Sequence, residues 1–337
     1  MKAYLVQRVL LMIPTFLGIT LVTFLIIQLA PGNPISTKLQ QLGGEGIRTE
    51  TVSRDVIEQT KKLYGLDQPL PVQYARWLKR VVTFDFGDSY KDHRPVIEKI
   101  REALPVTILL NILSVVLIYF LSVPLGIYSA MHPDSFWDRP VMLLLFLLYS
   151  LPAFWVAMLL IMYFGGGEYL DFFPVYGIVS TGFAEFSFWQ KSADLLWHLI
   201  LPVTVLTYGG LAFLTRFSRA QVLEVIRQDY IRTARAKGLS ENRVVFRHAL
   251  RNALIPFITL MSGLLPALIG GSVIVEQIFS IPGMGKLGFE AILSRDYPTV
   301  MAIATIEALL TLVSFLVSDL LYVVVDPRIS FEKVRQS

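Results

Sequence analysis

The stretch that decides the fold is RFSRAQVLEVIRQDYIRTARAKGLSENRVVFRHALR, residues 216–251. Nine of its residues are Lys or Arg and three are acidic, which gives a net charge of +6. An apolar run long enough to cross a bilayer lies on each side of it. Short loops rich in Lys and Arg are retained on the cytoplasmic side of a membrane, so this loop sets the predicted orientation of the whole chain.

The first half of this loop has the spacing of an amphipathic helix. On a helical wheel, the apolar stripe consists of Leu223, Ile226, Tyr230 and Ala234. The opposite face holds Glu224, Gln228, Arg232 and Arg235. We therefore predict a helix with one face suited to packing against another surface.

A glycine and a serine divide the loop into two helices. Gly238 is predicted to end the first helix, and Ser240, followed by Glu241, to cap the second. A basic loop that only holds topology and contacts lipid headgroups is the commoner explanation of such charge. That explanation, however, does not require two helices separated by a glycine.

The composition is that of a polytopic membrane protein. Hydrophobic residues make up 54% of the 337 residues, and the mean hydropathy is +0.58. The chain has no Cys, which excludes disulfides, thiolate metal sites and Cys nucleophiles. The excess positive charge resides in the 216–251 loop, so it does not point to a nucleic-acid partner. The apolar runs carry neither H-E-x-x-H nor paired aspartates, which argues against a membrane-embedded enzyme.

Six apolar segments reach the roughly 20 residues that a membrane helix needs. They are residues 9–30, 104–131, 140–167, 195–215, 253–275 and 300–325. The first is too long for the core of a signal peptide and lacks a cleavage site, so we expect it to be uncleaved. With six spans the termini share one side, and short segments on that side hold fifteen Lys and Arg residues against three on the other. We therefore expect both termini in the cytoplasm.

The sizeable polar region, residues 31–103, is predicted to lie outside. It is longer than about 60 residues and is therefore largely exempt from the positive-inside rule. Residues 52–64 and 71–82 have helical spacing, which predicts a small external helical cap. We accordingly divide the chain into a first span at 1–30, the cap at 31–103, a five-helix core at 104–326 that contains the loop 216–252, and a tail at 327–337.

Three acidic residues in or beside the spans are candidates to line a pathway. They are Glu276, Glu307 and Asp319. At the depths expected for them a hydrogen bond between helices is enough to offset the cost of the charge. We favour a structural role for Glu276 and Asp319, and Glu307 is the best candidate to face a pathway.

Two glycine patterns have separate explanations. The spacing of Gly263, Ala267 and Gly271 predicts a small-residue face on the fifth span, where another helix packs closely. Residues 283–288, GMGKLG, match the dinucleotide pattern G-x-G-x-x-G, but they follow a membrane helix and no strand precedes them. We expect a turn there and no phosphate site.

Several motifs resemble those of one transporter family. The central one is DYIRTARAKGL at residues 229–239, followed by HALRNA at 248–253 and by Pro256. It is similar to the cytoplasmic coupling loop of ATP-binding-cassette importer permeases, and more narrowly to that of the dipeptide, oligopeptide and nickel uptake family. Arg232, Thr233 and Ala234 stand where the wider superfamily has a Glu-Ala-Ala start. Further matches are APGNP at 30–34, YGLDQPLPVQY at 64–74, DFGDS at 85–89, EQIFSIPGMG at 276–285, RDYP at 295–298 and DPRI at 326–329.

This resemblance implies an all-α, six-helix membrane protein with the type I importer permease fold, in a bacterial inner membrane. It implies half of a translocation pathway for di- or oligopeptides, with no catalysis and no cofactor in this chain. The implied partners, besides the lipid bilayer, are a homologous second permease, two ATPase subunits that bind ATP and Mg²⁺, and an external substrate-binding protein. The implied ATPase-coupling residues are Asp229, Tyr230, Ile231, Arg232, Thr233, Ala234, Arg235, Ala236, Lys237 and Gly238. A nickel or other small-solute importer of the same family is an alternative, and a self-sufficient carrier or channel is a weaker one.

Overall fold

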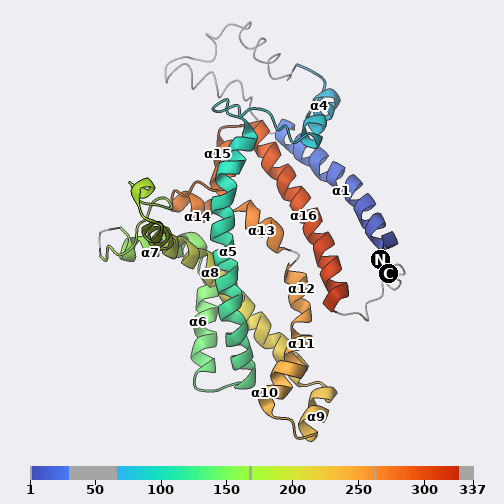
Figure 1. The fold of residues 1–337 in the computed structure, drawn as a ribbon, viewed down its shortest axis with the longest axis vertical. Coiled ribbons are helices and arrows are strands. Elements are labelled where there is room, and N and C mark those ends of the chain that lie inside the picture. Colours follow the sequence, from blue (N-terminus) through green and yellow to red (C-terminus); the bar gives the residue numbers. More distant parts are fainter. Residues whose placement is uncertain (1, 30–66, 167–168, 262, 326–337) are drawn as a thin grey trace. The chain divides into compact units, whose positions relative to one another are not determined.

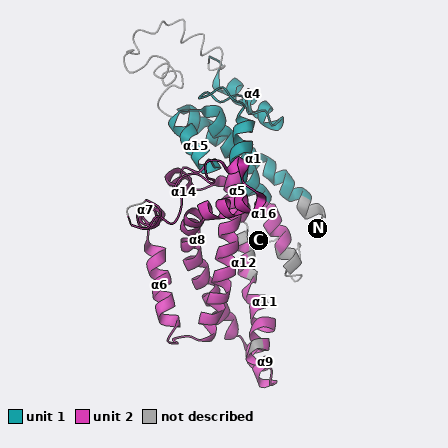
Figure 2. Cartoon of the chain, turned by 60° about the vertical axis from the view of Figure 1, so that its left-hand side comes forward, with its two compact units in different colours: residues 1–105, 283–313 teal, residues 106–282, 314–337 magenta. Residues whose placement is uncertain are grey.

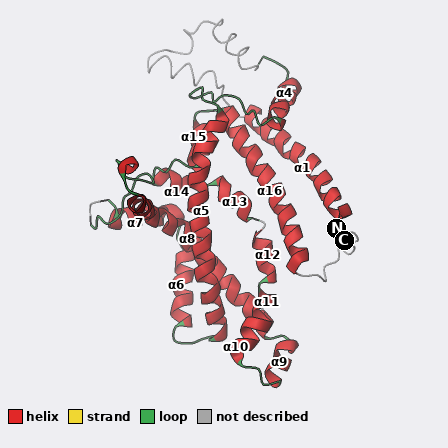
Figure 3. Cartoon of the chain, in the orientation of Figure 1, coloured by secondary structure: helices red, strands yellow, loops and turns green. Residues whose placement is uncertain are grey.

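The computed structural model describes residues 2–29, 67–166, 169–261 and 263–325 (Figure 1). Throughout these ranges the regular structure is helical, and the one β-type contact is an isolated bridge between Asp88 and Pro95 (Figure 3). The predicted all-α class is confirmed. The helix predicted at 52–64 and the tail at 327–337 lie outside the described residues.

The chain forms two compact units, each assembled from separate stretches of sequence (Figure 2). The first unit consists of residues 1–105 and 283–313, and the second of residues 106–282 and 314–337. Two long helices, α5 (Val96–Met131) and α16 (Tyr297–Val325), contribute to both units. The segment before the second predicted span, up to residue 105, therefore belongs to the same unit as the segment that leads into the last predicted span, from residue 283.

The described part of the first unit contains three further helices, α1 (Lys2–Leu29), α4 (Leu70–Val82) and α15 (Met284–Leu293). Helix α4 begins with Pro71 in its first turn, where a proline removes no helical hydrogen bond. Its Val81 packs with Phe86, Ile100 and Met284 in the core of this unit. Most apolar side chains of α1 are exposed, as a helix that faces lipid requires.

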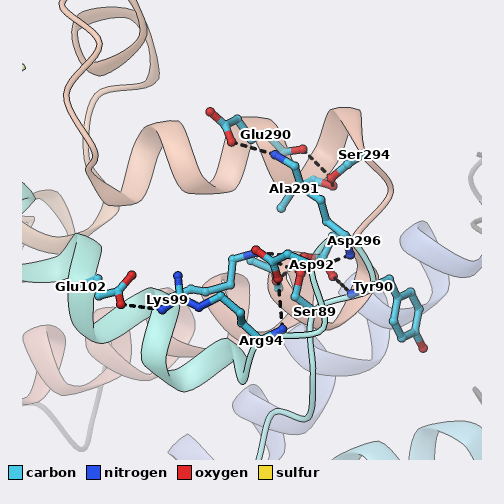
Figure 4. Close-up of polar contacts among 12 residues, drawn as sticks. Ser89, Tyr90, Asp92, Arg94, Lys99, Glu102, Glu290, Ala291, Ser294 and Asp296 are labelled. Atoms are coloured by element: carbon cyan, nitrogen blue, oxygen red, sulfur yellow. Dashed lines mark hydrogen bonds and ion pairs between the residues drawn. The ribbon is translucent and has the colours of Figure 1, made fainter. Parts of the chain in front are cut away.

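A buried carboxylate joins two loops of the first unit (Figure 4). Asp296 accepts hydrogen bonds from Ser89 Oγ at 2.5 Å, from the Tyr90 backbone N–H at 2.8 Å and from Thr299 Oγ1 at 2.6 Å. The ammonium group of Lys99 lies 3.6 Å from the same carboxylate. Two motifs noted in the sequence, DFGDS and RDYP, therefore meet here.

The second unit packs its helices around an apolar core. Its main helices, besides parts of α5 and α16, are α6 (Asp138–Ser150), α7 (Ala153–Phe164), α8 (Phe188–Ile226) and α14 (Val273–Ile278). Leu110, Ala157, Leu199 and Phe279 are buried together in the core. Helix α8 has 39 residues and extends well beyond the predicted fourth span at both ends.

In the described ranges, four helices are long and apolar enough to cross a membrane: α1, α5, α8 and α16. Helices α6 and α7 pass the same test only as a pair, and they are bent by 102° at Leu151 and Pro152. The predicted third span, residues 140–167, is therefore sharply bent, because Pro152 has no N–H to donate and begins α7 at a new angle. Residues 2–29, 67–166, 169–261 and 263–325 thus hold four spans by length and composition, or five if the bent pair is one.

The predicted fifth span, residues 253–275, is also broken. Its part of the chain consists of α11 (Leu250–Ala253), α12 (Ile255–Met261), α13 (Leu264–Gly270) and then α14. Gly263 lies at the start of α13, and Gly271 lies beyond its end with φ +70° and ψ 175°, a conformation that glycine alone adopts readily. Gly263, Ala267 and Gly271 therefore do not line one continuous helix, and the predicted small-residue face is wrong.

The glycine pattern at 283–288 begins a helix. Gly283 has an extended backbone at the N-cap of α15, so the expectation of a simple turn is wrong. Gly285 is buried, and a Cβ on Gly288 would lie 3.6 Å from the Ile303 side chain. Gly288 therefore faces Ile303 of α16 within the first unit, at a distance that would leave room for a Cβ.

Candidate functional site

The basic loop begins with a break directly after α8. Helix α8 ends at Ile226, and Gln228 takes an extended conformation with ψ 149° before α9 (Asp229–Ala236). The apolar stripe predicted through Leu223, Ile226, Tyr230 and Ala234 therefore does not lie on one helix, and this prediction is wrong. The break turns α9, so that Ile231 is fully buried whereas Tyr230 is 42% exposed.

The inner face of α9 is held by the helix that follows it. Ile231 and Ala234 pack against Val244 and Ala249 of η4 (Val244–Ala249), a short π-helix. Val225, Ile226 and Leu239 complete this cluster. Burial of an isoleucine side chain contributes about 1.5 to 3 kcal/mol, so α9 is anchored to its own chain without any partner. Figure 1 shows α9 with α10 (Glu241–Arg243) and α11 at one end of the second unit.

Gly238 ends α9 as predicted. Its φ is +76°, and its N–H donates to the Arg235 carbonyl at 2.9 Å. A Cβ at this position would meet no atom within 4 Å, so the backbone alone requires glycine there. Ser240 takes the N-cap position of α10, as predicted, but its side chain makes no capping hydrogen bond.

An ion pair joins the two helices across Gly238. Arg235 Nη2 lies 2.5 Å from Glu241 Oε1, and Arg235 Nε lies 3.1 Å from Glu241 Oε2. These two hydrogen bonds hold the pKa of Glu241 below its usual value. The side chains are 40% and 50% exposed, so the pair fixes geometry more than it adds stability.

The outer face of α9 is exposed and polar around one aromatic ring. Asp229 and Arg232 approach each other at 3.5 Å but remain mostly exposed. The Tyr230 hydroxyl accepts a hydrogen bond from Asn252 Nδ2 at 2.7 Å, which orients the ring. Thr233, Ala236 and Lys237 are also exposed. The helix thus has a fixed inner face and an open outer face.

Three contributors to this site were missed in the sequence: Ile231 as the anchor, Glu241 as the partner of Arg235, and Asn252 as the partner of Tyr230. A signal existed for the first, because Ile231 is the one aliphatic residue larger than alanine in residues 229–238. Glu241 was read only as part of a helix start. Asn252 lies 22 residues from Tyr230, and no pattern in the sequence connects them.

Glu276 is fully buried at the break between α13 and α14. Its Oε1 accepts from Thr107 Oγ1 at 3.0 Å and lies 3.4 Å from the Ser272 backbone N–H. Asn111, one turn along α5 from Thr107, donates to the carbonyls of Ala267 and Leu268 at 2.9 and 3.1 Å. Asn111 of α5 therefore satisfies carbonyls at the end of α13. The N–H groups at the start of α14 bond to Ser272 and Glu276 of the same segment, and Thr107 of α5 holds the Glu276 carboxylate.

The other two pathway candidates lie on α16. Glu307 belongs to the first unit and is partly buried, and no hydrogen bond or ion pair joins its carboxylate to another residue in the described ranges. Asp319 belongs to the second unit and is also partly buried. A pathway role for Glu276, Glu307 and Asp319 stays a prediction. In the part of the chain that the structure describes, no three His, Asp or Glu residues are grouped closely enough to hold a metal ion.

Comparison with known proteins decides the family. Residues 122–331 match the family described as binding-protein-dependent transport system inner membrane component, and residues 1–111 match its N-terminal companion. The chain belongs to this family. Among its relatives, the oligopeptide transport system permease protein AppB of Bacillus subtilis (strain 168) is 43% identical, over 98% of this chain and 100% of the relative.

Two further relatives match this chain over the same share of its length as AppB does. The inner membrane ABC transporter permease protein YejB of Escherichia coli O157:H7 is 37% identical, and the dipeptide transport system permease protein DppB of Alkalihalophilus pseudofirmus is 36% identical. Each alignment covers 98% of this chain and 100% of the relative. The chain is therefore a multi-pass inner-membrane permease.

Proposed function

We propose that this permease forms half of the translocation pathway of an ATP-driven peptide importer. The observation that carries the proposal is similarity along the full length of the chain to relatives named for oligopeptide and dipeptide transport. The anchored helix α9 supports it, because it provides a rigid surface through which a partner could act on the membrane helices.

Helix α9 is the proposed contact with the ATPase. Its inner face, Ile231 and Ala234, fixes it to η4 and to the end of α8, so a push on α9 is transmitted to the helices on both sides of the loop. Its outer face, with Tyr230 at the centre, is free to enter a groove of the partner. Gly238 and the pair Arg235 and Glu241 set the angle between α9 and α10. The coupling set from Asp229 to Gly238 thus divides into an inner anchor and an outer contact.

In this proposal the permease has six spans, an external helical cap between the first two, and both termini in the cytoplasm. The bent pair α6 and α7 and the broken helices α11 to α14 would supply the third and fifth crossings. Prolines and glycines are tolerated in such crossings where other helices satisfy the freed backbone groups, and Asn111 has that role here.

The permease itself would hydrolyse nothing. ATP and Mg²⁺ would bind to two ATPase subunits, a homologous permease would form the other half of the pathway, and an external binding protein would deliver the peptide. Glu307 is the proposed pathway residue, because its partly buried carboxylate is available to a cationic group of the cargo.

The function is tested by uptake of labelled peptides into cells that lack the gene and into cells that carry it on a plasmid. Uptake of a tripeptide or tetrapeptide should depend on the gene and on an intact partner ATPase. Nickel uptake should be the same in both strains. Gene-dependent uptake of nickel without uptake of peptide would replace peptides by metal as the cargo.

The orientation is tested with single cysteines, because the chain has none of its own. Thr181 and Ser240 are both exposed and are predicted to lie on opposite sides of the membrane. In intact cells an impermeant thiol reagent should label Thr181→Cys and not Ser240→Cys. The opposite result would place α9 outside, where no ATPase could reach it.

A further inference from the structure

A small cleft in the first unit is lined by arginine, glutamine and aromatic side chains. It has a volume of about 100 Å³, and its polar lining consists of Gln28, Gln73, Arg76, Arg80, Tyr90 and Tyr297. Pockets for drug-sized ligands measure about 300 to 1,000 Å³, so this cleft is too small for a peptide. A single charged group of a larger molecule fits its size better.

The two arginines lie one helical turn apart on α4 and face the same cleft. Neither guanidinium makes a hydrogen bond or ion pair with any residue that the structure describes. Three other cations of this unit do have carboxylate partners: Arg94 with Glu102 and Lys99 with Asp92, all four labelled in Figure 4, and Lys91 with Glu290. The cleft therefore concentrates positive charge without an acid from the described chain to balance it.

The cleft lies beside the end of a membrane span. Helix α4 is joined to the C-terminal half of α1 by two of its side chains. The Tyr74 hydroxyl lies 3.0 Å from Thr20 Oγ1 and 3.2 Å from the Leu17 carbonyl, and Gln73 Oε1 accepts from Gln28 Nε2 at 3.0 Å. Helix α1 is a candidate span from Val6 to Leu29, so α4 is held at the level where that span leaves the bilayer.

The surroundings of α4 suit a membrane surface. Four apolar side chains in or next to it are exposed: Leu70, Val72, Val82 and Phe84. Trp77 and Tyr74 of α4 contact each other with ring centroids 6.0 Å apart, and Tyr90 and Tyr297 line the cleft. Aromatic residues at a span end, basic residues and exposed apolar groups together are typical of a helix that lies in the interface.

We propose that Arg76 and Arg80 bind the phosphate of an anionic phospholipid headgroup. Guanidinium groups bind phosphate oxygens through paired hydrogen bonds, and the amide of Gln73 and the hydroxyls of Tyr90 and Tyr297 are positioned in the same cleft to contact the rest of the headgroup. The exposed apolar side chains would lie among the acyl chains of the same lipid layer. The site would fix α4 to the membrane and is independent of the transported substrate.

The test measures retention of phosphatidylglycerol by the purified transport complex in detergent, with native mass spectrometry. Arg76→Gln and Arg80→Gln should each weaken phosphatidylglycerol binding about five-fold, the effect of one basic residue near an anionic membrane surface. Lys79→Gln is the matched control, because Lys79 is an exposed cation of the same helix that does not line the cleft. Lys79→Gln should weaken phosphatidylglycerol binding less than about two-fold. A two-fold change corresponds to about half of the binding free energy lost in a five-fold change.

A second arm separates the lipid from soluble anions and from zwitterionic lipids. Inorganic phosphate or glycerol 3-phosphate at millimolar concentration should not displace the lipid, and phosphatidylcholine should bind equally to all four proteins. Displacement by free phosphate would assign the cleft to a soluble anion. Equal phosphatidylglycerol binding by Arg76→Gln, Arg80→Gln and Lys79→Gln would show that the cleft is not a headgroup site, and either result overturns the proposal.

Discussion

Ser89 donates its hydroxyl hydrogen to the carboxylate of Asp296 at 2.5 Å, and both residues are fully buried. The two residues are 207 positions apart, in two loops of the first unit. Asp296 also accepts from the Tyr90 backbone and from Thr299, so the short loop before α16 is fixed by three donors and by the nearby Lys99. The relationship connects the start of the last membrane helix to the loop before α5.

Replacement of Asp296 by Ala should destabilise the first unit by about 3 kcal/mol. Several buried donors would lose their acceptor, and Lys99, only 10% exposed, would keep Asp92 as its one carboxylate partner among the described residues, beside its hydrogen bond to Ser89 Oγ. Thermal unfolding of the purified complex measures the change. Glu102→Gln is the control, because it breaks only the solvent-exposed pair with Arg94 and should leave the unfolding temperature almost unchanged. An equal loss of thermal stability in both variants would show that Asp296 does not stabilise the first unit in this way.

Thr107→Val should loosen the break between α13 and α14. The variant keeps the shape of the side chain but removes a donor to the fully buried Glu276, at a cost of about 1 to 3 kcal/mol. Thr204→Val is the matched control, because Thr204 is exposed and, among the described residues, its hydroxyl bonds only to the Ile200 carbonyl of its own helix. Thermal stability of the complex should fall in the first variant and stay within about 0.5 kcal/mol in the second. A similar fall in both would mean that the break does not depend on α5.

Sequence patterns predicted the helical class and the stop at Gly238, because hydropathy and a left-handed glycine act locally. They did not show how sharply the third and fifth predicted spans are broken. A run of apolar residues has the same hydropathy whether its helix is straight or broken, and prolines such as Pro152 are also common in continuous membrane helices. What permits the break at Gly271 is the side chain of Asn111, which caps carbonyls 156 and 157 residues away.

The inner and outer faces of α9 were assigned incorrectly for a related reason. A helical wheel assumes that α8 continues into α9, and nothing in the residue types at Arg227 and Gln228 marks the break. Two residues outside both helices, of which Gln228 is extended, change which side chains face inward. Ile231 therefore becomes the buried anchor, and Tyr230 becomes exposed.

Reversal of one charge in the pair Arg235 and Glu241 should impair coupling, and reversal of both should restore it. Arg235→Glu places two acids together across Gly238, whereas Arg235→Glu with Glu241→Arg restores an ion pair of opposite sense. The stability change should stay under about 1 kcal/mol, because both side chains are partly exposed. Substrate-stimulated ATP hydrolysis is the readout. A double variant as impaired as the single one would show that α9 does not need this contact.

Gly238→Ala should cost about 1 to 2 kcal/mol in the loop, from the backbone alone. The added methyl group meets no atom within 4 Å, and the strain comes from φ +76°. Gly238→Asn should cost less, because asparagine tolerates this conformation better. Limited proteolysis of the loop should therefore find Gly238→Ala the most sensitive protein, Gly238→Asn intermediate and the wild type the most resistant.

The control for this backbone effect is Gly209→Ala. Its added methyl group also meets nothing within 4 Å, but Gly209 lies inside α8, where alanine is favourable. In the Gly209→Ala variant, the loop that contains Gly238 should resist the protease as well as it does in the wild type. A Gly209→Ala variant as sensitive as Gly238→Ala would contradict the backbone explanation.

The last prediction separates the two faces of α9. Ile231→Asp would put a charge into the buried cluster with Val244 and Ala249, so it should unfold the loop and reduce the yield of the whole complex. Tyr230→Asp changes a residue that is already 42% exposed, so the permease should fold and insert normally. If the Tyr230 ring enters the ATPase, the buried charge would cost several kcal/mol at that contact, and the ATPase should no longer copurify.

Asn252→Ala is the matched control for Tyr230→Asp, because it removes the hydrogen bond to the Tyr230 hydroxyl and leaves the ring in place. The Asn252→Ala complex should retain most of the ATPase and of peptide uptake. Normal copurification and normal uptake with Tyr230→Asp would exclude the outer face of α9 as the ATPase contact, whatever Ile231→Asp does to the fold.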